Sequence, residues 1–293
     1  MLGGTRFVGR HIAQALLAQG HALTLFHRGQ SGPDLFPAAR HVRGDRDQGF
    51  DTLGAGTWDA VIDTSAYFPR QVRGAHAALA GRAGRLVFVS TISVYAEPLV
   101  APVTEDSPLA PADFDAQAVT AETYGGLKAG CEAAVAQGWG DAAWVLRPGL
   151  VVGPHDPTGR FGHWVAAMRR NTPFAGPPRL AQPLQVLDAR DLGAFVAHGL
   201  ATGAHGTMQV AGERGTFAAL FALGQASWPQ ARPLPPEPGA EDLPLVLPAD
   251  GTADALLALD CARARVAGFA PRPLAQTLAA CAAAQEDAGS WFS

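Results

Sequence analysis

The stretch Gly3-Gly4-Thr5-Arg6-Phe7-Val8-Gly9 decides how the rest of the sequence is interpreted, because an amphipathic helical pattern, Arg10 to Gln19, follows it directly. A glycine-rich turn that enters a helix exposes backbone N–H groups and the positive end of the helix dipole, and both favour a pyrophosphate. Gly3 allows the tight turn and Gly9 allows close packing, whereas Arg6 stands where the usual fingerprint has a glycine. The residues predicted to contact a dinucleotide here are Gly3, Thr5, Arg6, Phe7, Val8 and Gly9.

The first half of the chain alternates short apolar runs with helical patterns, which is typical of βαβ units and a parallel sheet. We expect strands at residues 21–27, 41–43, 58–64, 85–89 and 143–146, and helices at 10–19, 71–80 and 122–136. The predicted fold is α/β, a Rossmann-type doubly wound parallel sheet with a smaller C-terminal α/β substrate-capping domain. The predicted dinucleotide-binding domain covers residues 1–155, residues 184–203 return to its sheet as a strand and a helix, and residues 156–293 form the capping region.

Only Met1 and Leu2 precede the glycine loop, although the strand before such a loop is normally central in the sheet and typically has ~5–6 residues. We expect that the true start lies a few residues upstream or that the chain has been trimmed. An intact mass measured on protein from the native host tests this expectation, and a mass equal to that of the printed sequence would contradict it.

The end of the second expected strand indicates which dinucleotide is used. It reads His27-Arg28-Gly29, and no acidic residue follows before Asp34. An acid at this position binds the ribose 2′-hydroxyl of NAD, whereas an arginine accommodates the 2′-phosphate of NADP. Arg28 therefore favours NADP, with NAD as the alternative cofactor and a solvated surface arginine as the alternative interpretation. Further residues expected beside the cofactor follow the third and fourth strands: Asp45 at the adenine edge, and Thr64, Ser65 and Ala66.

Tyr124 and Lys128 form the pair most indicative of chemistry. Lys128 is the single lysine among 22 basic residues, and a spacing of four puts both side chains on one face of a helix. An ammonium group can lower the pKa of a neighbouring phenol and exchange protons with it, which a guanidinium cannot do. Because a tyrosine with a pKa of ~10 needs such help at neutral pH, we predict that Tyr124 is a general acid–base assisted by Lys128.

Hydroxyl groups cluster at the carboxyl end of the strand before this pair, in the stretch Val87 to Tyr95. Thr91 could hold a substrate carbonyl by a hydrogen bond while Tyr124 moves the proton, although simple capping is the alternative role for such a residue. The predicted catalytic set is Thr91, Tyr124 and Lys128, and Ser90, Lys128 and Pro148 are expected at the cofactor.

Composition excludes several classes of protein. The 293 residues carry a net charge of −4, which argues against nucleic-acid binding by phosphate neutralisation. No apolar run reaches the ~18 residues that span a membrane, and no export signal is apparent. The three cysteines are widely spaced, as expected for reduced thiols in the cytoplasm, and the histidines lack metal-ligand spacing. We expect a cytoplasmic protein that acts on a small molecule, with no metal, nucleic acid or membrane partner.

The sequence resembles the extended short-chain dehydrogenases/reductases, of the NAD-dependent epimerase/dehydratase type. The resemblance covers nearly the whole chain and includes the glycine loop, the segment Ser90–Tyr95, Tyr124-x-x-x-Lys128, Arg147-Pro148-Gly149 with Gly153-Pro154, Asp188–Asp191 and Gly268–Leu274. The loop with its arginine is most similar to an atypical subgroup that includes bacterial reductase-like proteins and plastid stem-loop RNA-binding relatives. The resemblance implies that Tyr124 is the acid–base, that Lys128 contacts the nicotinamide ribose, and that Thr91 orients the substrate. It also implies a homodimer formed through the helix that carries Tyr124.

Two departures from the family pattern narrow the expected function. Ile92 and Ser93 replace the acidic pair of sugar-nucleotide dehydratases, and Leu150 replaces the asparagine that holds the substrate diphosphate in sugar-nucleotide epimerases. We therefore predict an NAD(P)-dependent oxidoreductase acting on a small carbonyl or alcohol substrate. The alternatives are a sugar-nucleotide epimerase, and a catalytically silent member that binds NAD(P) or RNA.

Overall fold

The main sheet of the protein has six parallel strands. Between two of them lies a further position, which is occupied only by the isolated bridges of Leu2. The computed structural model describes residues 1–287. The strands of this sheet are β1 (Thr24–His27), β2 (Arg40–Arg43), β3 (Val61–Asp63), β4 (Leu86–Val89), β5 (Ala143–Pro148) and β9 (Gly206–Val210). The pairings run β1 with β2, and β3-β4-β5-β9, all parallel. Leu2 joins the two groups, since it forms parallel bridges to Phe26 of β1 and to Asp63 of β3.

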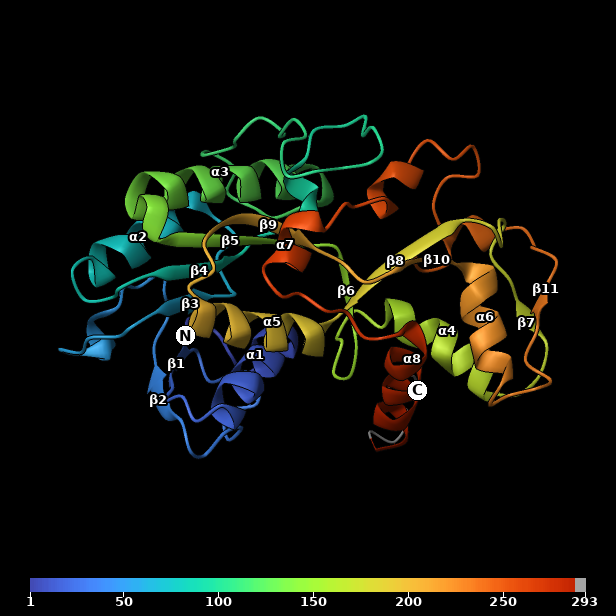
Figure 1. Ribbon diagram of the computed structural model, residues 1–293, viewed down its shortest axis with the longest axis horizontal. Helices are drawn as coiled ribbons and strands as arrows, with labels where there is room; N and C mark the ends of the chain where they lie inside the picture. Colours follow the sequence, from blue (N-terminus) through green and yellow to red (C-terminus); the bar gives the residue numbers. More distant parts are fainter. Residues whose placement is uncertain (288–293) are drawn as a thin grey trace.

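Helices cover both faces of this sheet (Figure 1). One face is packed by α2 (Pro69–Leu79) and α3 (Ala121–Trp139), and the other by α1 (Phe7–Ala18) and α5 (Ala189–Thr202). The helix α5 approaches α1 so closely at Gly193 that an added Cβ would lie 2.6 Å from the backbone oxygen of His11. Each face has its own apolar core. The core under α1 and α5 includes Ile12 and Phe195, and the core under α2 and α3 includes Val72 and Val135. The predicted doubly wound α/β architecture of the Rossmann type is confirmed.

The second lobe has a separate apolar core around Trp164 and Phe217. Its strands and helices are β6 (Leu150–Val152), α4 (Arg160–Arg169), β7 (Phe174–Ala175), β8 (Pro183–Asp188), β10 (Arg214–Thr216), α6 (Phe217–Gln225), β11 (Pro233–Leu234) and α8 (Leu274–Asp287), and α7 (Ala262–Val266) lies by β9. Figure 1 shows this lobe beside the carboxyl ends of the main strands. None of the helices in residues 1–287 has the length and apolar character needed to cross a membrane.

The structure corrects how two strands were assigned. The strand predicted at residues 184–187 does not return to the main sheet, because β8 pairs with β6 and β10 in a three-stranded sheet of the second lobe. Only the helix of the 184–203 segment, α5, packs on the main sheet. The strand β9, which we expected within the capping region, extends the main sheet beside β5. Both runs are short and apolar, so periodicity alone could not assign either one to a sheet.

The chain passes between the lobes at a narrow junction. Gly149 separates β5 from β6, and its N–H donates to the carbonyl of Val210 at the end of β9 (2.9 Å). An added Cβ on Gly212, which lies between β9 and β10, would come within 2.2 Å of the Val186 oxygen. Glycine is therefore required at position 212, where a side chain would collide with the backbone, whereas a Cβ on Gly149 would meet the side chains of Leu259 and Ala211 at 3.1 and 3.3 Å.

Side chains at the start of α5 tie it to the last helix. Asp188 caps α5 through the N–H of Arg190 (2.9 Å) and accepts a hydrogen bond from the Thr277 hydroxyl of α8 (2.9 Å). Burial alone would raise the pKa of Asp188, but its bonds with Arg190 and Thr277 outweigh this and lower it. The Asp188–Asp191 motif therefore fixes α8 against the nucleotide-binding lobe.

Candidate active site

A single cavity of about 810 Å³ brings every predicted site residue together. It runs along the carboxyl ends of the main strands and is lined by residues that follow β1, β2, β3, β4 and β5. The predicted residues that line it are Gly3, Thr5, Arg6, Phe7, Val8, Gly9, Arg28, Asp45, Thr64, Ser65, Ala66, Ser90, Thr91, Tyr124, Lys128 and Pro148. The cavity thus connects the glycine loop to the tyrosine–lysine pair in one continuous space.

The glycine loop is shaped for close approach of the backbone. Gly3 and Gly4 have φ values of +91° and +111°, a region that side chains rarely adopt. An added Cβ on Gly9 would lie 2.8 Å from the Gly4 nitrogen. The first turn of α1 has neither a side-chain cap nor an acidic residue, so its N–H groups face the cavity without a competing carboxylate.

A chain of two histidines fixes the loop that follows β1, and our sequence analysis did not anticipate it. His27 Nδ1 accepts from the Gly29 N–H (3.0 Å), which leaves the proton on Nε2 to be donated to His41 Nδ1 (2.9 Å). His41 Nε2 can then donate to the Phe36 carbonyl (3.2 Å). Burial, with the charges of His41 and Arg43, lowers the pKa of His27, which keeps this ring neutral. The relay positions Arg28 at the cavity.

A buried ion pair lies at the bottom of the cavity near Ser65, and our sequence analysis did not predict it either. The guanidinium of Arg46 donates to both carboxylate oxygens of Asp63 (2.8 and 2.7 Å) and to Ser65 Oγ (2.9 Å). Burial would raise the pKa of Asp63, but the charge and hydrogen bonds of Arg46 outweigh it and hold that pKa below its ordinary value. The carboxylate also accepts from the Ser65 N–H (2.9 Å). The signal available in the sequence was an acid at the end of an apolar strand, Val61–Asp63.

The three predicted catalytic residues come from β4 and α3. A capping box between Thr120 and Thr123 starts α3 just before Tyr124, and Lys128 lies one turn further on. Lys128 is 4% exposed, and its Nζ donates to the carbonyls of Ala66 (3.0 Å) and Val89 (2.9 Å). Thr91 caps the short turn after β4, since its Oγ1 accepts from the Ser93 N–H (3.1 Å).

The protonation of Tyr124 differs from the sequence-based prediction. We expected Lys128 to lower the pKa of the phenol. In the structure, burial raises the pKa of Tyr124, and its hydrogen bond with Thr91 and the charge of Arg160 only partly oppose this. Burial likewise lowers the pKa of Lys128. The phenol is therefore protonated at neutral pH, which is the form that donates a proton.

A buried network lies behind Ser90. The Ser90 hydroxyl donates to Glu132 (2.5 Å), and Arg147 holds the same carboxylate through Nε and Nη2, the latter at 2.7 Å. Arg147 also reaches the Tyr95 hydroxyl (3.3 Å), which donates to Gln209 of β9 (2.9 Å). The Ser90 hydroxyl therefore donates its hydrogen bond within the protein and not to a ligand. Arg147 supports the sheet beneath the cavity without lining it.

The second lobe closes the far end of the cavity. The residues that it contributes are Leu150, Val151, Pro157, Thr158, Arg160 and Leu256. Apolar side chains dominate this set, and Arg160 carries its single charge. Our sequence analysis did not identify Arg160 as a site residue, since the loop that places it in the cavity has no recognisable pattern.

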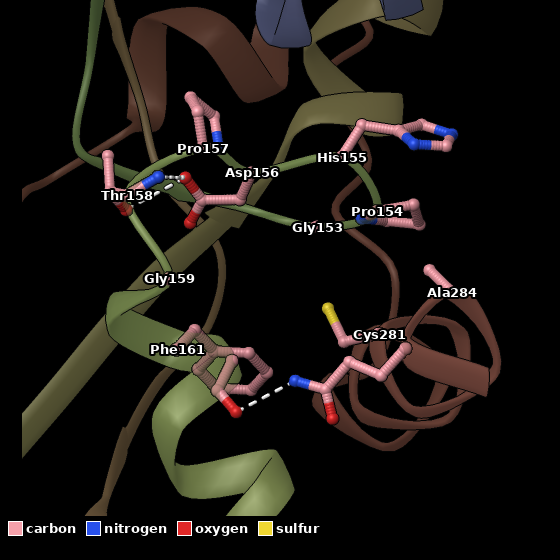
Figure 2. Close-up of a pocket in the computed structure, with 12 residues that line it drawn as sticks. Gly153, Pro154, His155, Asp156, Pro157, Thr158, Gly159, Phe161, Cys281 and Ala284 are labelled. Carbon is pink, nitrogen blue, oxygen red and sulfur yellow. Dashed lines mark hydrogen bonds between the residues drawn. The ribbon is translucent and has the colours of Figure 1, made fainter. Parts of the chain in front are cut away.

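A smaller cavity of about 150 Å³ lies on the other side of the loop from Gly153 to Gly159 (Figure 2). Pro157 and Thr158 line both cavities, so this loop forms the wall between them. Asp156 Oδ1 accepts from the N–H and the hydroxyl of Thr158, both at 2.8 Å, which stiffens the wall. Within residues 1–287, no group of three or more His, Cys, Asp or Glu could hold a metal ion.

Comparison with solved structures shows which proteins share this fold. The structure of WbmG from Bordetella bronchiseptica, in complex with NAD and UDP, superposes with a TM-score of 0.68 at 20% identity, over 98% of this chain and 94% of that one. UDP-glucose 4-epimerase from Thermotoga maritima, with UDP-glucose, gives a TM-score of 0.69 at 18% identity, over 99% and 98%. A Burkholderia cenocepacia protein proposed to be an epimerase gives 0.74 at 18% identity, over 97% of each chain. This chain therefore shares its fold with these proteins over nearly its whole length.

Similarity in sequence is much more local. The chain is 42% identical over 50 residues to the chloroplast stem-loop binding protein of 41 kDa b from Arabidopsis thaliana. The matched segment is 17% of this chain and spans only 12% of that protein's length. No model of a known protein family matches the chain.

Proposed function

We propose that this chain is an NAD(P)-dependent oxidoreductase that transfers hydride to or from a small carbonyl or alcohol substrate. One observation carries the proposal: a single cavity contains the glycine loop at one end and Thr91, Tyr124 and Lys128 at the other. A dinucleotide is long enough to extend from one end of such a cavity to the other, with its phosphates at a helix N-terminus. The fold, shared with enzymes crystallised with NAD, supports this.

The glycine loop fits a bound dinucleotide, because Gly3 and Gly4 carry no side chain that would cover their backbone. A Cβ on Gly3 would lie 2.6 Å from Thr64 Oγ1, so only glycine leaves the backbone accessible there. The α1 N–H groups would hold the pyrophosphate, and Arg6 lies at the N-cap position beside them. A bound nicotinamide supplies the hydride chemistry, and the protein supplies orientation and a proton route.

The chain's own residues provide that proton route. Tyr124, protonated at neutral pH, donates its proton to a substrate carbonyl, and in the reverse direction it accepts the proton of an alcohol. Thr91, hydrogen-bonded to Tyr124, orients the substrate oxygen. Lys128, anchored by two backbone carbonyls, keeps a buried positive charge one helical turn from the phenol. We assign the acid–base role to Tyr124 and the positioning roles to Thr91 and Lys128.

We favour NADP over NAD for this chain. Arg28 lines the cavity after β1, and no acidic residue stands at that strand end to bind a 2′-hydroxyl. The relatives crystallised with NAD support NAD as the alternative. A homodimer through α3 stays a prediction.

Fluorescence titration with NADPH and NADH tests the proposal directly. We expect the full-length protein to bind NADPH more tightly, and Arg28→Ala to reduce this preference by about 10–100-fold, since charge-assisted hydrogen bonds contribute about 1.5–3 kcal/mol. Lys128→Ala should weaken binding of both, and Arg170→Ala, which lies outside the cavity lining, serves as the control. If the wild-type protein binds neither dinucleotide, the proposal is wrong.

A sugar-nucleotide epimerase is the second candidate, because UDP-glucose 4-epimerase shares the fold over nearly the full length. Leu150 argues against it, since an apolar side chain lines the cavity where the resemblance calls for an asparagine. Turnover of UDP-glucose without net oxidation of the cofactor would favour this candidate. A protein that binds RNA and lacks activity is supported only by the short match to the stem-loop binding protein.

A further inference from the structure

Arg160 lies at the start of α4, where the second lobe meets the cavity. It lines the same space as Thr91, Ser93 and Tyr124. It is also close enough to Tyr124 for its charge to act on the phenol. The guanidinium is therefore positioned at the reacting end of the cavity, whereas Arg6 and Arg28 lie toward the predicted phosphate end.

The charge of Arg160 is not neutralised by the part of the chain that the structure describes. Its Nε donates to Thr158 Oγ1 (3.2 Å), and no ion pair or hydrogen bond involves its terminal amino groups within residues 1–287. By contrast, Arg46 in the same cavity lining is paired with Asp63 through both of its terminal nitrogens. The first turn of α4 also contains no acidic side chain, and a cation at a helix N-terminus is unfavourable with the helix dipole.

No acidic side chain within residues 1–287 forms an ion pair with Arg160. The acidic residues that line the cavity, Asp45 and Asp47, both follow β2, and Asp156, outside this lining, is linked to Arg160 only through the hydroxyl of Thr158. The second-lobe residues that line the cavity together with Arg160 are mostly apolar, with Leu150 and Val151 among them. A cation without an ion pair beside Tyr124 fits a ligand that carries its own negative charge.

We propose that Arg160 binds an anionic group of the substrate, a carboxylate or a phosphate, and so selects a small hydroxy or keto compound of negative charge. This inference rests on the proposed oxidoreductase function. The planar guanidinium offers two parallel donors that match both kinds of anion. The anion would lie on the second-lobe side of Tyr124 while the carbonyl faces the phenol and Thr91.

Two matched pairs of aldehydes test the proposal: 4-oxobutanoate against butanal, and glyceraldehyde 3-phosphate against glyceraldehyde. Within each pair the reacting carbonyl is kept and the negative charge is removed. Binding to the protein saturated with the oxidised cofactor is measured by calorimetry, and reduction is measured with the reduced cofactor. We expect at least one anionic probe to bind about tenfold more tightly than its neutral counterpart.

The variants separate charge from structure. Arg160→Gln should abolish the preference for the anion, whereas Arg160→Lys should keep part of it. Arg170→Gln, at the other end of α4, should keep all of it.

Three results would overturn the inference: no anion preference in the wild-type protein, a preference that persists in Arg160→Gln, or an equal loss for the anionic and neutral members of a pair. Failure of the wild-type protein to bind NADPH or NADH would instead contradict the proposed function. The two failures are therefore distinguishable.

Discussion

The two ends of the cavity are built in different ways. The end at the glycine loop is made of backbone, of Arg6 and Arg28, and of a buried ion pair in which Arg46 is held by Asp63. The end at the second lobe is made of apolar side chains and of Arg160, which has no ion pair within residues 1–287. Arginines without an ion pair in this part of the chain thus lie at both ends, but backbone and a buried ion pair surround the first and apolar side chains surround the second. The difference supports our proposal that the loop end holds the cofactor and that the second lobe determines the substrate.

Tyr124, where the two ends meet, should show the largest effect. Tyr124→Phe removes the proton donor and leaves the ring, so turnover should fall about 10²–10⁴-fold while cofactor binding is retained. Tyr67, whose ring centre lies 6.3 Å away, provides a comparison with no proton role assigned. Equal loss in Tyr67→Phe and Tyr124→Phe, measured as kcat/KM, would contradict the assignment.

Breaking the buried ion pair behind Ser90 should lower the stability of the protein. The side chains of Arg147 and Glu132 are 5% and 9% exposed, so Glu132→Ala leaves a buried charge unpaired. We expect the free energy of unfolding, from urea denaturation, to fall by about 3–5 kcal/mol. Glu213→Ala removes an exposed partner of Arg265 and should cost about 0–1 kcal/mol. A similar cost for both would show that the Arg147–Glu132 pair does not support the sheet as we describe.

Gly9→Ala tests the rigidity of the glycine loop. The new Cβ would lie 2.8 Å from the Gly4 nitrogen, and overpacking of this kind costs about 1–3 kcal/mol. NADPH binding should weaken about tenfold, as measured by fluorescence. Gly74→Ala in α2, where the nearest atom to a Cβ lies 4.0 Å away, is the matched control. It should stabilise the protein by about 0.5–1 kcal/mol, and unaltered NADPH binding in Gly9→Ala would refute the rigid loop.

The pH dependence of the reductive and oxidative rates tests the protonation state of Tyr124, where the two ends of the cavity meet. Because burial raises the pKa of Tyr124, the phenol stays protonated up to and beyond its ordinary pKa of about 10. The reductive rate should therefore remain flat through neutral pH and fall only above this value. The oxidative rate, which needs the phenolate, should rise with pH over the same range. A reductive rate that falls between pH 6 and about 8 would indicate a lowered phenol pKa.

The smallest effect is expected at the apolar wall of the second lobe. Leu150→Asn introduces the amide that the family uses to hold a diphosphate, and one added hydrogen bond contributes about 0.5–1.5 kcal/mol. Binding of UDP, measured by calorimetry, should improve about 2–10-fold. A much larger gain would mean that this end of the cavity is already shaped for a sugar nucleotide, contrary to our preference for a small substrate.

Local motifs predicted one end of the site better than the other. The glycine loop and the Tyr124–Lys128 pair are each encoded within a few residues, so their spacing was sufficient to place them. Arg46 with Asp63, His27 with His41 and Glu132 with Arg147 are pairs from different elements, and only the folded sheet brings them together. Arg160 could not be identified for the same reason. The assignment of β8 and β9 failed because two short apolar runs are equivalent until their partners are known.

The glycine junction has a mechanical consequence. Gly149 packs against Ala211 and Leu259, and Gly212 packs against Val186, so the passages of the chain from one lobe to the other are gathered at one place. A methyl group added at Gly212 would push against the Val186 backbone, so we expect it to displace the second lobe relative to the main sheet. A substitution outside the cavity lining would then change how long a substrate is retained.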